Sequence, residues 1–210
     1  FRDFEIKCEA FDYRNFYNDS LACAIAAKNI TSYVNKTNPE KCLFTPEQAY
    51  TVGLLSQVGK LAFAAVCPQP YNRMLLENTD GGGQELCDME KKEFGIDHCE
   101  IAADMLSEWH FPESFCKAIR YQYSYPENQD MFKNDVVASA LANKLKAAGF
   151  MLRWSRTIST TVNSNNKVDK KHIVNTLDKA GEFGICPGNY HKQAVSTQKE
   201  WRTMKSIMDM

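Results

Sequence analysis

The sequence predicts an all-α fold. Apolar residues recur at helical intervals through most of the chain, and capping signals mark several helix starts. No segment alternates apolar and polar residues as a half-buried strand would, and no internal repeat is visible. The 210 residues are 44% hydrophobic and 24% charged, which is a globular composition with enough apolar side chains to form a core.

Five helices are expected in the first half of the chain. Thr45 and Gln48 have the spacing of a capping box at a helix start. Asp97 and Glu100 repeat this pattern, and Gly95 just before them occupies the usual position of a C-terminal cap. The expected helices cover residues 20–30, 45–61, 67–75, 85–94 and 97–109.

The second half continues the helical pattern. Pro112 marks a helix start, Pro126 marks a stop, and Gly149 marks the end of a later amphipathic helix. A stretch rich in Ser, Thr and Asn over residues 157–167 predicts a linker. The remaining expected helices cover residues 112–123, 130–148, 168–184 and 189–208.

Charge and cysteine usage argue against several classes of protein. The formal net charge of −1 gives no general surface for nucleic acid or for an anionic membrane. The eight cysteines are scattered without a Cys-x-x-Cys pair, and most lie beside apolar residues, as buried free thiols do. Such thiols persist in a reducing compartment, so we expect a cytoplasmic protein. No signal peptide and no apolar run near the ~20 residues of a membrane span is visible in the sequence.

Four segments of the chain resemble the HDOD domain. They read FYNDSLACAIAAK, EQAYTVGLLSQVGKLAF, EKKEFGIDHCEIAADMLSEWHFPESFCKAI and ALANKL, in the order and at the spacing of that family. The HDOD domain is a non-catalytic bacterial signalling relative of the HD and HD-GYP metal-dependent phosphohydrolases. The resemblance implies an HD-domain-like helical bundle over residues 1–150, followed by a loop and C-terminal helices over residues 151–210 that pack on it or on a partner. Because the family usually carries a further helical part upstream, we expect that part to be missing here.

The resemblance also implies that the metal-ligand positions of the HD hydrolases have been vacated. Active members hold a divalent ion with His and Asp side chains and use it to activate water. Neutral oxygens from Ser, Gln and Asn bind such an ion poorly without several carboxylates beside them. We therefore expect no catalytic residues, metal or cofactor, and we expect these polar side chains to hydrogen-bond one another. The vacated positions fall on Asp19, Ser56, Gln57, Gln122, Tyr123 and Asn143.

One further pair of polar residues matches the family. His98 stands in the segment GIDHCE, and Glu90 precedes it by eight residues on the preceding expected helix. We expect Glu90 to orient His98 across the turn at Gly95, which makes the two a structural pair or part of a polar site.

The expected function is a regulatory module of HDOD type that acts through protein–protein interaction. The resemblance implies signalling proteins as partners, from two-component or cyclic di-GMP pathways, and neither nucleic acid nor membrane. A divergent metal-dependent phosphohydrolase acting on nucleotides or cyclic di-GMP is an alternative, and it requires Asp19 and His98 to converge with nearby carboxylates. A nucleotide-binding sensor that uses the vacated cavity without cleavage is another. The sequence names no partner, input signal or oligomeric state.

Overall fold

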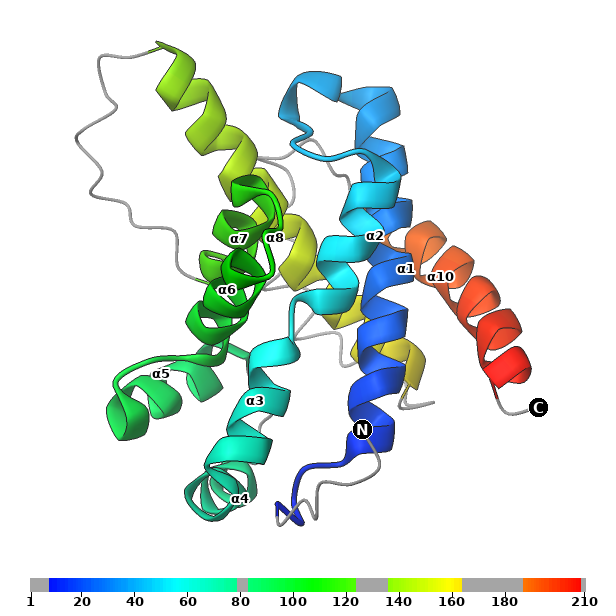
Figure 1. Ribbon diagram of the computed structural model, residues 1–210. Coiled ribbons are helices and arrows are strands. Elements are labelled where there is room, and N and C mark those ends of the chain that lie inside the picture. Colours follow the sequence, from blue (N-terminus) through cyan, green and yellow to red (C-terminus); the bar gives the residue numbers. More distant parts are fainter. Residues whose placement is uncertain (1–7, 79–82, 124–135, 164–186, 209–210) are drawn as a thin grey trace.

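The predicted all-α class is confirmed. The computed structural model describes residues 8–78, 83–123, 136–163 and 187–208, and every regular element within these ranges is a helix (Figure 1). The elements are α1 (Tyr13–Thr37), the 3-10 turn η1 (Pro39–Lys41), α2 (Pro46–Leu55), α3 (Val58–Val66), α4 (Pro68–Glu77), α5 (Gly83–Phe94), α6 (His98–Glu108), α7 (Glu113–Arg120), α8 (Val136–Asn163) and α10 (Pro187–Met208).

The long helix α1 lies at the centre of the bundle, where it contacts α2, α8 and α10 (Figure 1). Its middle is rich in small side chains, and Ala24 and Ala27 are completely buried. Gly53 of α2 packs there so closely that an added Cβ would lie 3.0 Å from Ala24 Cα. The helix is longer than the predicted 20–30 because the Asp12 side chain caps its start and no helix breaker follows before Pro39.

The predicted single helix over residues 45–61 is wrong, because it is broken at Ser56 and Gln57. The capping box of Thr45 and Gln48 is present at the start of α2. Gln57 leaves helical geometry with φ −115° and ψ 7°, and α3 begins at the next residue. The Ser56 hydroxyl donates to the Gly53 carbonyl at 2.9 Å, which satisfies one of the last free acceptors of α2.

Helix α8 continues through Gly149, where the sequence predicted a stop. An added Cβ on Gly149 would lie 3.2 Å from the Tyr121 carbonyl oxygen, so the glycine serves a close approach to the end of α7. Residues 157–163 of the predicted linker are helical, and the rest of that linker lies outside the described residues.

The C-terminal part is described only in α10. This helix agrees with the one expected over residues 189–208, whereas the helix expected over 168–184 lies outside the described residues. Trp201 of α10 and Trp154 of α8 belong to one hydrophobic cluster with residues of α1. Residue 150, the expected domain boundary, lies within α8, and the division into two parts stays a prediction.

Buried apolar residues form two clusters. The larger cluster surrounds α1 and includes Val52, Ala102 and Ile119. The smaller one joins α3, α4 and α5 and includes Phe63 and Tyr71, whose rings stack with centroids 5.3 Å apart. Along the chain, the break at residues 56–57 separates Val52 of the first cluster from Phe63 of the second.

One segment is apolar enough to be considered as a membrane span, although the sequence predicted none. Pro39–Val66 reaches a mean hydropathy of 1.3 over its best window, of which 44% is buried inside the protein. The structure divides this segment into η1, α2 and α3, so it is not one continuous helix. Core helices of soluble proteins pass the same test of length and composition.

Replacing Gly59 by Ala should destabilise the chain, because the new Cβ would lie 1.9 Å from the carbonyl oxygen of His98. This contact is with backbone, so α3 has to move away from α6, at a cost of about 3 kcal/mol. Denaturant unfolding measures the loss. Ala65→Gly, at an exposed site on the same helix, is the control and should cost about 1 kcal/mol through propensity alone. Equal losses for the two variants would contradict the close packing of Gly59.

Candidate functional site

The buried Glu90 carboxylate on α5 is the centre of the candidate site. Its Oε2 accepts from the His98 backbone N–H at 2.8 Å and from His98 Nδ1 at 2.6 Å, and its Oε1 accepts from the Tyr71 hydroxyl at 3.2 Å. Glu90 and His98 are both fully buried. Three donors therefore compensate the carboxylate, and they connect α4, α5 and α6. The structure thus brings together the two residues that the sequence paired.

The turn between α5 and α6 explains why His98 lies beside Glu90. Gly95 ends α5 with φ +76°, a conformation that favours glycine. The Asp97 side chain then caps α6 by accepting from the backbone N–H groups of Cys99 and Glu100, each at 2.9 Å. The Glu100 carboxylate accepts from the Asp97 N–H at 3.0 Å, which completes a capping box. The turn thus has a fixed geometry that places the His98 N–H within hydrogen-bond distance of the Glu90 carboxylate.

Ser56 and Gln57 lie at the break between α2 and α3, and each is only 1% exposed. The Ser56 hydroxyl lies 4.0 Å from the Cys23 sulfur, and the Ser56 carbonyl accepts from Gln122 Nε2 at 3.2 Å. Both polar atoms of the Gln57 amide are buried without a hydrogen-bond partner among the described residues. The Gln122 side chain thus bonds to the Ser56 backbone rather than to the Ser56 side chain, and the Gln57 amide does not take part in the expected bonding.

Gln122 and Tyr123 follow the end of α7 and face the same site. Gln122 is buried, and its amide nitrogen also donates to the Cys99 sulfur at 3.0 Å. The Tyr123 ring lies edge-on to the His98 imidazole with centroids 6.1 Å apart, and burial raises the pKa of its hydroxyl. These two residues therefore border His98.

Asn143 does not join the site, and its expected place there is wrong. Its side chain is exposed near the start of α8. The part of α8 that acts on the site carries Arg156, 13 residues further along and about 20 Å away on the helix axis. The prediction for Asn143 failed because α8 continues through Gly149, so a later part of the helix, rather than Asn143, lies near the site.

The Arg156 guanidinium acts electrostatically on groups from four other segments. Its positive charge lowers the pKa of four groups, Cys23, Lys60, Tyr71 and Tyr123. For Cys23, Tyr71 and Tyr123, burial has the larger effect and raises the pKa. Burial holds the pKa of Cys23 at about 11 despite Arg156 and the Ser56 hydrogen bond. The sequence did not predict a role for Arg156, because a single Arg in a helix is usually exposed to solvent. The signal that could have indicated it is its place within the largely apolar segment FMLRWSRTI.

Lys60 adds a second cation from α3. Burial of its ammonium group, and then the charge of Arg156, lower its pKa to about 7, while Glu90, Cys99 and Cys87 act in the opposite direction. The half-buried Asp19 on α1 raises the pKa of Cys23, so its negative charge also acts on this region.

These residues do not fit the divalent ion of an HD hydrolase. Ser56 and Gln57 offer neutral donors, and the nearby side chains of Lys60 and Arg156 are basic and offer no anionic oxygen. Hard divalent ions require several anionic oxygens.

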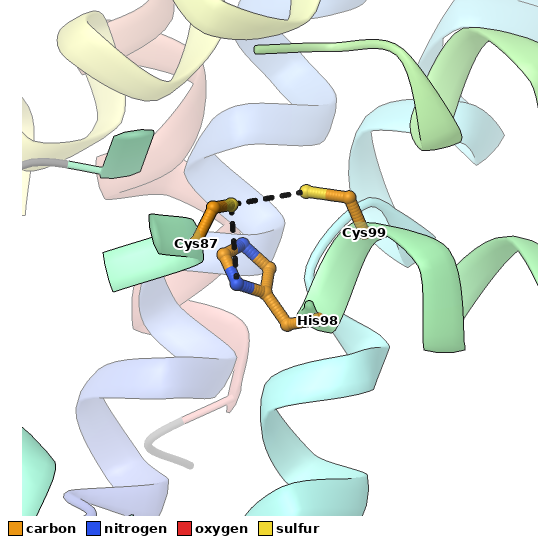
Figure 2. Close-up of side chains that lie close together, drawn as sticks. All are labelled: Cys87, His98 and Cys99. Atoms are coloured by element: carbon orange, nitrogen blue, oxygen red, sulfur yellow. Dashed lines mark hydrogen bonds between the residues drawn. The ribbon is translucent and has the colours of Figure 1, made fainter. Parts of the chain in front are cut away.

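Two cysteines near His98 were not expected from their spacing in the sequence. Figure 2 shows Cys87 of α5 and Cys99 of α6 with their sulfur atoms on the same side of the His98 imidazole. The two sulfurs lie 3.8 Å apart, and the Cys87 sulfur lies 3.7 Å from His98 Nδ1. The contact with Cys99 and then burial raise the pKa of the Cys87 thiol. Every cysteine that the structure describes is a free thiol.

Replacing Glu90 by Gln should destabilise the fold by about 3 kcal/mol, because it removes the charge that accepts all three buried donors. Urea unfolding at neutral pH measures the loss. Glu93→Gln, at an exposed position of the same helix, is the matched control and should change stability by less than about 0.5 kcal/mol. If Glu90→Gln lowered the free energy of unfolding as little as the control does, the carboxylate would not stabilise the contacts among α4, α5 and α6.

Lys60 should make stability depend on alkaline pH. Its pKa in the folded chain, about 7, lies below the ordinary 10.5, so the unfolded chain binds this proton more tightly. Stability therefore rises with pH between about 7 and 10.5, by at most about 1.4 kcal/mol per unit from this group. Lys60→Met should flatten the rise in that window, as measured by denaturant unfolding at several pH values. The exposed Lys92→Met should keep it, and parallel curves for wild type and Lys60→Met would contradict the assignment.

Solved structures share this fold. A response regulator, MmoQ from Methylococcus capsulatus str. Bath, matches with a TM-score of 0.61 and 24% identity, over 90% of this chain and 64% of that chain. A fragment of MmoQ, residues 20–298, matches with a TM-score of 0.52 and 26% identity, over 81% of this chain and 59% of the fragment. A candidate phosphohydrolase from Shewanella amazonensis SB2B matches with a TM-score of 0.60 and 21% identity, over 92% of this chain and 66% of that chain. The chain thus spans less than two thirds of each of these solved chains.

The family comparison agrees with the motifs described above. A search of curated proteins gave no significant match. The family model described as the HDOD domain matches residues 2–125, which include α1 to α7 and end before α8. The HD-domain-like helical fold and the resemblance found in the sequence are both confirmed. The chain belongs to the HDOD family.

Proposed function

We propose that the chain is a non-enzymatic regulatory module of bacterial signal transduction that works in the cytoplasm through protein–protein contacts. The observation that carries this proposal is the replacement of the hydrolytic ligand set. By the family resemblance, Ser56 and Gln57 stand where HD hydrolases carry the adjacent His and Asp that bind the metal, and the positive charge of Arg156 acts on the surrounding groups.

The electrostatics of the site support the absence of hydrolysis. A metal-dependent phosphohydrolase needs an ion that lowers the pKa of a bound water and offsets the negative charge of the phosphate. The half-buried side chains of Lys60 and Arg156 offer no anionic oxygen to such an ion. Glu90 is already engaged by His98 and Tyr71, so it is not free to serve as a ligand.

The solved relative supports a role in signalling. The MmoQ fragment at 26% identity belongs to a protein described as a response regulator. Components of two-component or cyclic di-GMP pathways are therefore the partners that we propose. A protein of this kind passes on its signal by presenting a folded surface, and the buried polar site then serves to hold the helices in place.

A turnover assay tests the proposal. The full chain, supplied in turn with Mn²⁺, Fe²⁺ and Mg²⁺, should hydrolyse neither bis-p-nitrophenyl phosphate nor cyclic di-GMP above the rate of the buffer. An active HD hydrolase measured in parallel shows that the conditions permit turnover. Hydrolysis that disappears in both Asp19→Ala and Gln57→Ala would overturn the proposal and favour the divergent phosphohydrolase. Hydrolysis unaffected by either variant would indicate a contaminating enzyme.

A further inference from the structure

The buried thiols beside His98 lie outside the positions that an HD hydrolase uses for its metal. Cys87 and Cys99 come from α5 and α6, with exposures of 2% and 1%. Their sulfurs and a ring nitrogen of His98 all lie within 4.8 Å of one another. We propose that Cys87, Cys99 and His98 form a binding site for a zinc ion, which goes beyond the regulatory function proposed above.

The distance between the sulfurs fits tetrahedral zinc. Zinc–sulfur bonds of about 2.3 Å at tetrahedral angles place two sulfur ligands about 3.8 Å apart. Cys87 Sγ and Cys99 Sγ are 3.8 Å apart. A disulfide requires about 2.05 Å, so the observed spacing suits an ion between the sulfurs better than a bond.

The second observation that points to a ligand is the state of the His98 ring. Glu90 accepts from Nδ1 at 2.6 Å, which leaves Nε2 as the nitrogen with a free lone pair. Nε2 is buried and has no hydrogen-bond partner among the described residues. The contact that Figure 2 draws from Cys87 Sγ to the ring, at 3.7 Å, is with Nδ1. Metal-binding histidines commonly donate their other N–H to a carboxylate, and Glu90 already accepts it here.

Gln122 supplies a hydrogen-bond donor to one of the two proposed sulfur ligands. Gln122 Nε2 lies 3.0 Å from Cys99 Sγ, so its N–H would stabilise a thiolate at that position. Two thiolates and one imidazole are soft and borderline ligands, which select zinc over magnesium, calcium and manganese. On binding, both thiol protons leave for solvent, and His98 stays neutral with its Nδ1 proton held by Glu90.

Metal titration of the reduced full chain tests the site. Zinc, measured by competition with a chromophoric chelator, should bind at one ion per chain. Cobalt should give the thiolate-to-cobalt charge-transfer absorption expected for two sulfur ligands. This spectrum of the unaltered chain tests the ligands without a variant that must fold. Absence of zinc binding, or a cobalt spectrum without thiolate absorption, would overturn the proposal.

Variants locate the ion. Cys87→Ser combined with Cys99→Ser should weaken zinc binding by more than the roughly 10–100-fold that loss of an outer contact costs. Cys116→Ser, at a buried cysteine of α7 outside the cluster, should leave the affinity unchanged. Asp19→Ala should also leave it unchanged, which distinguishes this site from the vacated hydrolase positions. Full binding by the double variant, or its loss in Asp19→Ala, would place the ion elsewhere and overturn the inference.

Discussion

The buried Glu90 carboxylate is the constraint on which the rest of the site depends. Removing a carboxylate from water is costly unless donors surround it, and three donors from α4 and α6 do so here. They fix where α6 begins and which way the His98 ring faces. Gly59 then sets α3 directly against the His98 carbonyl, so the position of α3 depends on the same contact.

A continuous series of polar contacts extends from this carboxylate through the bundle. Glu90 bonds to His98, His98 contacts Cys87, Cys87 contacts Cys99, and Cys99 accepts from Gln122. Gln122 then reaches the Ser56 carbonyl at the break between α2 and α3. The HD fold here keeps a connected polar interior although its side chains differ from those of a hydrolase. Such an interior specifies how the helices pack.

Local features of the fold were predictable, whereas those set by distant contacts were not. The capping box at Asp97 and the cap at Gly95 depend on neighbouring residues, so the turn that brings Glu90 to His98 could be inferred from sequence. The break at Gln57 and the passage of α8 through Gly149 depend on what packs against them.

The site was predictable to a similar extent. Ser56, Gln57 and Gln122 could be placed from family spacing, and all three are buried together. Arg156 reaches the site from a helix whose length the sequence misjudged, and Cys87 meets Cys99 only after α5 and α6 fold together. No pattern along the chain records such encounters between helices.

The division of the core into two hydrophobic clusters has a consequence for local opening. Val52 and Ala102 belong to the cluster around α1, whereas Phe63 and Tyr71 belong to the smaller one. Cooperative units of unfolding follow contiguous apolar contacts. Local opening of the smaller cluster would therefore break the contacts of Phe63 and Tyr71 first, while Val58 at the start of α3 stays with the cluster around α1.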